Sequence, residues 1–234
     1  MAARASALDL LARGTVSLKG RMPWSSNATF LVECALDTAA GLAVYKPLRG
    51  ERPLWDFPPG LYRREIAAYR LSEALGWGVV PPTIAREGPL GAGSLQLFIS
   101  ADFEQHYFTL LERPEHGERL RRICAFDLLL NNADRKSGHC LLGEDGLIWA
   151  IDNSLSFHVE EKLRTVIWDF GGEPIARDLL DDVQRLLDER ASPDLADLLA
   201  PGEEAALVTR ARALLEGGRF PVARGARRYP WPLV

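Results

Sequence analysis

The sequence predicts an α+β protein of two lobes, an N-terminal lobe built on an antiparallel sheet and a mainly helical C-terminal lobe. Three observations support this class. Short strand patterns separated by Gly, Asp and Pro turns fill residues 15–99, helical periodicity dominates after residue 118, and the pattern changes near residue 100. We therefore expect lobes at residues 1–100 and 101–234, with a cleft between them.

The N-terminal lobe is expected to hold five strands and two helices. Apolar alternation, turn residues and helical periodicity place a helix at 3–13, strands at 15–19, 28–36, 42–46, 79–84 and 94–99, and a helix at 61–75. Residues 37–41 are predicted to form a turn. The proline-rich stretch 48–60 shows no period, which predicts a long ordered loop or a lid.

The C-terminal lobe is expected to be helical around one central loop. Helices are predicted at 119–130, 175–190 and 203–216, and prolines extend the tail. Two short strands, at 140–142 and 147–151, follow the loop and form a hairpin.

The composition is that of a folded chain with a substantial core. Of the 234 residues, 47% are hydrophobic, which excludes wholesale disorder and suffices for two small lobes. A net charge of -4 gives no general attraction to a polyanion, so we expect neither nucleic acid nor a membrane as a partner. Three cysteines without metal-ligand spacing predict reduced thiols and a cytoplasmic protein.

The segment 127–153, DLLLNNADRKSGHCLLGEDGLIWAIDN, carries the most informative pattern. An apolar helix enters a polar loop that contains Asp134 and Lys136, and an apolar strand delivers Asp152. Two carboxylates with a cation between them suit phosphoryl transfer, in which one carboxylate orients the acceptor hydroxyl, one holds a divalent cation and a Lys neutralises the phosphate. We therefore expect Asp134 and Lys136 to be catalytic and Asp152 to bind metal. A polar surface turn is the alternative interpretation of this loop.

His139 follows Asp134 in the spacing D-x-K-x-x-H. A neutral imidazole nitrogen can bind a divalent cation, so His139 is the second candidate metal ligand. Imidazole is a softer ligand than an amide oxygen, and we therefore expect Mn²⁺ to serve as readily as Mg²⁺.

Lys46 ends a predicted strand in the string AVYKP, and the next helix supplies Glu65. An inward-facing Lys is costly to bury unless it meets an acid or an anion. The pair is therefore predicted to hold the ammonium group against the phosphates of a nucleotide. A solvent-exposed Lys at a strand end is the alternative.

Two weaker signals complete the candidate nucleotide site. The turn 20–27 contains Ser25 and Ser26, whose small side chains would let backbone N–H groups approach phosphate oxygens. The strand that includes Gln96 and Phe98 lies where the lobes would join and is expected to contact a purine. An ordinary hairpin turn and an ordinary core strand are the corresponding alternatives.

As a set, these strings resemble the phosphatidylinositol 3-/4-kinase-related branch of the protein-kinase-like superfamily and, more distantly, HipA-type kinases. The likeness rests on VYKP, ADRKSGHCLL and AIDNSLSF and covers roughly residues 15–220. It implies a two-lobed protein-kinase-like fold, ATP with Mg²⁺ or Mn²⁺, a hinge at 96–99, and Asp134 as the acid/base residue. Two positions depart from the family pattern: His139 replaces Asn, and Asn153-Ser154 replaces Phe-Gly.

The leading hypothesis is an ATP-dependent phosphotransferase that moves the γ-phosphate to a protein hydroxyl or to a small polar metabolite. A phosphoinositide acceptor is disfavoured because only Lys162 and Arg164 are basic in residues 153–174, against four acidic side chains. Two alternatives remain: a kinase-like enzyme that transfers AMP, and a catalytically silent nucleotide-binding scaffold, which Asn153-Ser154 would favour.

Overall fold

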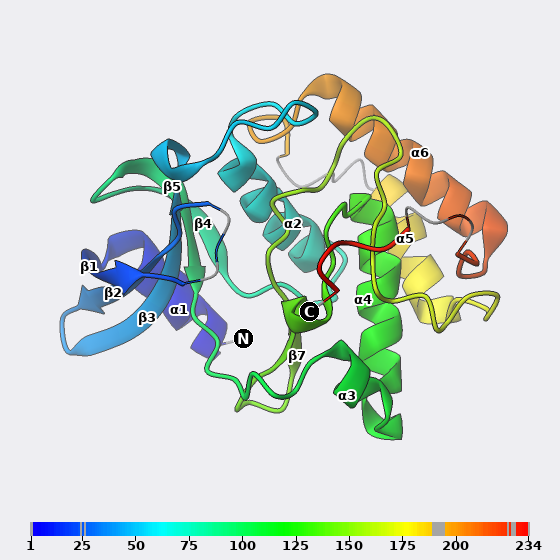
Figure 1. Cartoon of the computed structure of the whole chain (residues 1–234), viewed down its shortest axis with the longest axis horizontal. Helices are drawn as coiled ribbons and strands as arrows, with labels where there is room; N and C mark the ends of the chain where they lie inside the picture. Colours follow the sequence, from blue (N-terminus) through cyan, green and yellow to red (C-terminus); the bar gives the residue numbers. More distant parts are fainter. Residues whose placement is uncertain are drawn as a thin grey trace.

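An antiparallel sheet forms one half of the molecule and a group of helices forms the other (Figure 1). The coordinates are a computed structural model, which describes residues 2–23, 25, 27–188, 195–223, 225 and 228–233. The predicted α+β class with two lobes is confirmed. The five strands of the large sheet all precede residue 100, and the longest helices that follow it belong to the other half.

The sheet has the strand order β1-β2-β3-β5-β4, with every neighbouring pair antiparallel. Its strands are β1 Thr15–Arg21, β2 Phe30–Leu36, β3 Ala39–Pro47, β4 Thr83–Gly88 and β5 Gly91–Leu97. Helix α1, Ala2–Arg13, packs against one face, where Leu11 joins Val32, Ala43 and Tyr45 in a buried cluster. Because side chains alternate along a strand, Lys46 lies on the opposite face, toward the helical half.

Two strand boundaries differ from those expected at 79–84 and 94–99. Pro81 and Pro82 lack backbone N–H groups, so the ladder of β4 begins only at Thr83. The glycine-rich residues between the two expected strands, which predict a turn, include Gly88, Gly91 and Gly93, and all three pair in the ladder instead. A Cβ atom at Gly88 or Gly93 would come within 2.7 and 2.9 Å of the Tyr45 ring, so glycine lets these strands pass beside that ring.

The expected turn at 37–41 is also shorter than predicted, because β3 begins at Ala39. Asp37 adopts a left-handed conformation with φ of 52°, which allows the chain to reverse within two residues. The stretch 48–60 has no strand and no α-helix, and a single 3₁₀ turn, Leu48–Gly50, begins it.

The predicted helices, α1 among them, are confirmed within a few residues of their expected ends. The helices after α1 are α2 Leu61–Ala74, α3 Tyr107–Leu111, α4 Gly117–Leu130, α5 Arg177–Asp188 and α6 Pro201–Gly217, with 3₁₀ turns at Pro114–His116 and Ser137–His139. Helix α3 was not expected. Helix α2 lies between the sheet and the helical half (Figure 1), and α4 runs through the large hydrophobic core.

The loop after α4 leads into a small hairpin, β6 Cys140–Leu142 and β7 Ile148–Ala150. Asn131 ends α4 in a left-handed conformation with φ of 55°, which turns the chain into the loop. Over the part of the chain that the structure describes, none of the helices has the length and apolar character needed to cross a bilayer.

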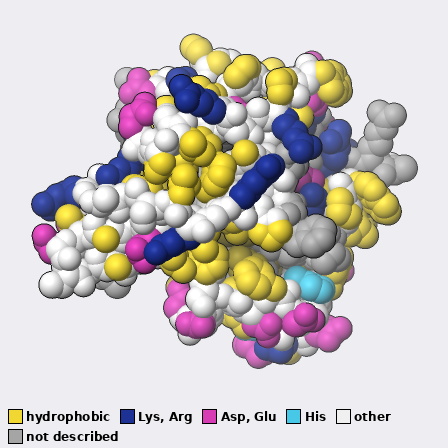
Figure 2. All heavy atoms as spheres, turned by 60° about the vertical axis from the view of Figure 1, so that its left-hand side comes forward, with side chains coloured by type: hydrophobic (Ala, Val, Ile, Leu, Met, Phe, Trp, Pro, Cys, Tyr) yellow, Lys and Arg dark blue, Asp and Glu magenta, His cyan; other side chains and the backbone are white. Residues whose placement is uncertain are grey.

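Charged side chains are unevenly distributed over the surface. On the face shown in Figure 2, hydrophobic side chains gather near the centre with Lys and Arg among and around them, while many Asp and Glu side chains lie at the lower edge. The net charge of -4 is therefore a poor guide to the local electrostatics of any one face.

Candidate active site

A cavity of about 580 Å³ lies between the sheet and the segments that precede β6 and follow β7. Residues from both halves of the molecule line it, among them Val44, Lys46, Gln96, Asp134, His139 and Asp152. Its size falls within the range of roughly 300–1,000 Å³ that is usual for small-molecule sites.

Lys46 joins the two halves at this cavity. Its Nζ atom donates to Glu65 of α2 and, over 2.8 Å, to Oδ1 of Asp152, which follows β7. Burial alone would lower the pKa of Lys46, but the charges of Asp152 and Glu65 outweigh it and raise that pKa. Glu65 is only 1% exposed, and burial raises its pKa although Lys46 opposes the change. One ammonium group therefore holds two carboxylates from elements far apart in the sequence.

Asp152 presents its carboxylate to the cavity, and its side chain remains 43% exposed. Burial would raise its pKa, but Lys46 and then His139 hold the pKa well below its ordinary range, so the group is anionic. Its backbone is left-handed, with φ of 54°, a conformation that costs energy for a non-glycine residue and is common at functional sites. The next residue, Asn153, donates its backbone N–H to Oε2 of Glu65 over 3.0 Å, which fixes the chain at this point.

A buried network holds both ends of the loop, and we did not predict it. Arg135 is 0% exposed and pairs with the equally buried Asp127 of α4 at 2.9 Å. Its guanidinium group also donates to the carbonyl of Ile151 and to Oδ1 of Asn153, each over 2.6 Å. Arg135 thus fixes the residues on both sides of Asp152. The only signal of this network in the sequence is Asp127, an acidic residue within the apolar run of α4.

Asp134 lies on the same wall of the cavity and pairs with Lys136 at 3.2 Å. Burial raises the pKa of Asp134, Lys136 opposes this rise, and the negative charge of Asp152 adds to it. The backbone N–H of Asp134 donates to the side chain of Asn132 over 2.9 Å, which orients the residue. A carboxylate with a raised pKa is a better proton acceptor than an ordinary surface Asp.

His139 places Nε2 3.6 Å from Oδ2 of Asp152, while its Nδ1 accepts the backbone N–H of Lys136 over 3.3 Å. Burial lowers the pKa of His139 to about 4, so the ring is neutral near pH 7. With Nδ1 accepting, the ring proton lies on Nε2 and faces Asp152. Binding of a cation through Nε2 would require the other tautomer.

Within the described residues, no group of three or more His, Cys, Asp or Glu is arranged to hold a metal ion. Asp152 and His139 supply two candidate metal ligands at the cavity wall. Mg²⁺ commonly takes one or two protein ligands and completes its coordination with phosphate oxygens and water. The residues present therefore fit a cation that arrives with a nucleotide, rather than one held by protein alone.

The remaining candidates are divided. Ser25 and Gln96 line the cavity; Ser25 bonds Thr29 at 2.8 Å. Ser26 lies outside the described residues. Phe98 is not among the described residues that line the cavity, and its backbone N–H donates to the carbonyl of Leu42 over 3.0 Å. The contact of Phe98 with a purine stays a prediction.

The stretch 48–60 borders the cavity and reaches the segment that follows Asp152. Leu54 lines the cavity, while Lys162 pairs with Asp56 at 3.4 Å and lies 5.3 Å from the ring of Trp55. The Trp55 side chain is nevertheless 92% exposed. These contacts of Lys162 therefore connect the stretch 48–60 to the segment after Asp152, at one edge of the cavity.

Comparison with solved structures yields proteins of the same fold. The structure of Fam20 from hydra, solved with a sugar, has a TM-score of 0.59 at 16% identity and covers 92% of this chain and 88% of its own. The Golgi casein kinase with Mn and ADP bound has a TM-score of 0.52 at 14% identity and covers 98% of this chain and 80% of its own. At such identities these matches show the fold alone, which is protein-kinase-like.

Among sequences, no family model matches the chain. Protein Rv2133c of Mycobacterium tuberculosis is 41% identical over 260 aligned positions, which cover 95% of this chain and 94% of that protein. The similarity thus runs through both lobes and is not confined to the cavity. The chain belongs to the same family as Protein Rv2133c.

Proposed function

We propose that this protein is an ATP-dependent phosphotransferase that moves the γ-phosphate of ATP to an alcohol group. The bridge from Lys46 to both Glu65 and Asp152, at a cavity that also contains Asp134, is the observation that carries this proposal. A lysine held by two carboxylates at a cavity is arranged to meet phosphate groups. The casein kinase neighbour binds Mn and ADP, which supports the same ligands here.

Each side chain has a distinct task in this proposal. Lys46 neutralises nucleotide phosphate oxygens, and Glu65 keeps its ammonium group in place. Asp134 accepts a hydrogen bond from the acceptor hydroxyl, and Lys136 lies beside it to offset negative charge on the transferred group. Asp152 and His139 would hold Mg²⁺ or Mn²⁺, which supplies further charge neutralisation when bound. Ser25 and Gln96 line the remaining nucleotide space.

The acceptor is proposed to be a protein hydroxyl or a small polar metabolite. Lys162, one of the two bases available for an anionic lipid headgroup, is engaged with Asp56 and Glu160. We retain the expected lobes at 1–100 and 101–234 and the distant kinship with phosphatidylinositol 3-/4-kinase-related and HipA-type kinases as parts of this proposal. The three cysteines are buried and free, which supports the expected reducing, cytoplasmic location.

The test uses purified protein with ATP labelled at the γ-phosphate and, in parallel, at the α-phosphate. Phosphotransfer predicts label in protein or metabolite acceptors only from the γ-position, with Mg²⁺ or Mn²⁺ present. Label from the α-position would instead establish AMP transfer. If ATP with either cation leaves the thermal transition unchanged, nucleotide binding itself is refuted, since a ligand at 100 times its Kd stabilises by about 2.7 kcal/mol.

A further inference from the structure

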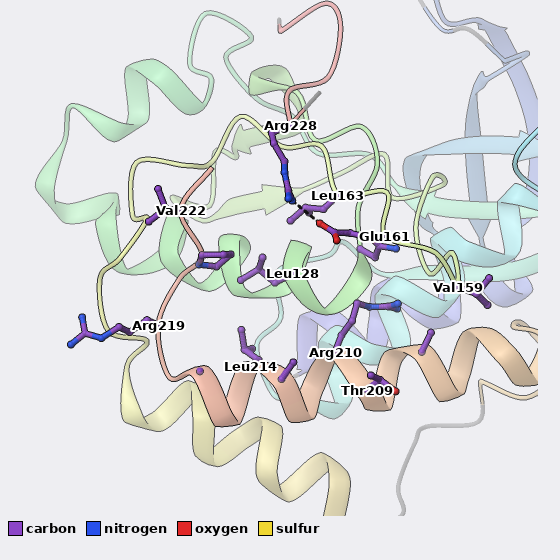
Figure 3. Close-up of a pocket in the computed structure, with 15 residues that line it drawn as sticks. Leu128, Val159, Glu161, Leu163, Thr209, Arg210, Leu214, Arg219, Val222 and Arg228 are labelled. Carbon is purple, nitrogen blue, oxygen red and sulfur yellow. Dashed lines mark hydrogen bonds and ion pairs between the residues drawn. The ribbon is translucent and has the colours of Figure 1, made fainter. Parts of the chain in front are cut away.

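A second cavity lies in the helical half, and among the described residues none lines both cavities. Its volume is about 770 Å³, again in the range of small-molecule sites. Helix α6 borders it on one side, the end of α4 and the segment 159–163 border it on another, and tail residues such as Val222 complete it (Figure 3).

The walls of this cavity are mostly apolar. Leu128, Leu163, Leu214 and Val222 contribute side chains from four different segments (Figure 3). Such walls favour a ligand with an aliphatic or other apolar body, because burial of apolar surface stabilises by roughly 25 cal/mol per Å².

Arg210 brings a positive charge to these apolar walls. Its side chain rises from α6 toward the centre of the region (Figure 3). Nε donates to the carbonyl of Leu129 over 2.8 Å and Nη1 donates to that of His158 over 3.2 Å. Nη2 is buried and has no hydrogen-bond partner among the described residues. Beside apolar walls, the guanidinium charge of Arg210 favours an anionic ligand over a neutral or a cationic one.

Among the described residues, no neighbouring acid forms an ion pair with Arg210. The carboxylate of Glu203 is bound to Arg64 and to the backbone N–H of Ala200. Glu161 pairs with Arg228 at 2.6 Å, and Figure 3 shows this pair opposite α6. Arg219 also belongs to the lining, although its side chain points away from the others (Figure 3). One carboxylate against three guanidinium groups leaves the described lining positive.

We propose that this cavity binds a small anionic amphiphile, an aliphatic chain ending in a carboxylate or a phosphate, with its head group at Arg210. Either head group pairs with the guanidinium charge of Arg210, and the aliphatic chain covers Leu128, Leu163 and Leu214. The ligand would lie against the segment after Asp152, which Asn131 secures by accepting the N–H of Lys162 over 2.8 Å and donating to the carbonyl of Glu160 over 2.7 Å. This proposal does not depend on phosphotransferase activity.

The first experiment is isothermal titration calorimetry of the full chain with sodium decanoate, decyl phosphate, decanol and decyltrimethylammonium. Both anions, or one of them, should bind saturably, and the response will distinguish a carboxylate from a phosphate head group. Decanol should bind at least roughly tenfold more weakly, because a neutral head group loses a charge-assisted hydrogen bond. The cationic amphiphile should not bind.

Two variants locate the ligand. Arg210→Met should weaken binding of the preferred anion by roughly tenfold or more, whereas Arg212→Met, at an exposed position on the same helix, should not. Ala213→Trp fills the cavity from a solvent-exposed position and leaves every charge in place, so it should abolish binding even if loss of Arg210 disturbs the fold. Bound anion should also slow amide exchange in segment 159–163.

Any of the following outcomes would overturn the proposal: no saturable binding of either anion, binding that decanol matches in affinity, or binding that survives both Arg210→Met and Ala213→Trp. Competition by ATP at the same stoichiometry would also overturn it, because it would place the anion in the other cavity.

Discussion

Replacement of Arg135 by Met should destabilise the protein far more than loss of any surface arginine. The change removes the partner of Asp127, whose side chain is 1% exposed, together with donors to Ile151 and Asn153. Breaking a buried ion pair by removing one member costs about 3–5 kcal/mol. Because a domain has only about 5–15 kcal/mol of stability, this variant should be marginally folded.

The cost should also depend on pH. Burial already raises the pKa of Asp127, and Arg135 opposes that rise. Without Arg135 the folded-state pKa rises further above the unfolded value of about 3.9. A carboxyl whose folded pKa is raised is most stable at low pH and loses stability as pH rises through that pKa. The penalty of Arg135→Met should therefore be smaller at pH 5 than at pH 8.

Urea denaturation of four proteins tests this reasoning: the natural sequence, Arg135→Met, Asp127→Leu and the double variant. The double variant should recover part of the loss, with a coupling energy of about 1–3 kcal/mol. Arg177→Met is the matched control, because that side chain is 86% exposed and its loss should cost less than about 0.5 kcal/mol. A cost below about 1 kcal/mol for Arg135→Met at pH 8, or additive single costs, would refute a structural role for the pair.

Three further predictions concern the cavity. Because the pKa of His139 falls from about 6.5 unfolded to about 4 folded, the metal-free protein should lose up to about 3 kcal/mol as pH falls between these values, and His139→Gln should remove that loss in urea titrations. Asp134→Asn should reduce phosphotransfer by roughly 10²-fold or more, while ATP affinity, measured by calorimetry, stays unchanged. Asp152→Ala should instead remove the cation dependence of ATP binding. Equal loss of ATP binding in both variants would contradict these roles. Lys162→Met should weaken ATP binding several-fold by releasing Asp56, and an unchanged Kd would show that the 48–60 stretch does not cover the nucleotide.

The elements of the cavity were predictable because their signals are local. Lys46 ends an alternating strand, Glu65 lies on a strongly periodic helix, and Asp152 follows an apolar strand. The element that carries each residue can be predicted from the pattern of about ten neighbouring residues. The opposite charges of Lys46 and the two acids then indicate that these elements lie together in the fold. The bounds of β5 were predicted wrongly for the opposite reason: the glycine-rich residues 88–93 resemble a turn in sequence, and only packing against Tyr45 makes them part of the strands.

The network around Arg135 could not be predicted in the same way. Its partners lie eight and eighteen residues away, at Asp127 and Asn153. Nothing local distinguishes Arg135 from Lys136, yet one side chain is fully buried and the other lies near the cavity. The burial of a side chain depends on the whole fold and not on its neighbours in the sequence. The free-energy cost of burying a charge, which makes the pairing of Arg135 with Asp127 necessary, therefore depends on the whole fold as well.

The same network bears on whether Asn153-Ser154 indicates a catalytically silent protein. Asn153 accepts from Arg135, donates to the carbonyl of Ala150 over 3.1 Å, and offers its backbone N–H to Glu65. These bonds hold Asp152 in its left-handed conformation without the Phe-Gly pair of the kinase pattern that the sequence resembles. Because Asn153 is 0% exposed and hydrogen-bonded through its side-chain oxygen, side-chain nitrogen and backbone N–H, its replacement of Phe is a different means of fixing the same aspartate. The departure from the kinase pattern that the sequence resembles is therefore an argument for an ordered Asp152, and not for a lost site.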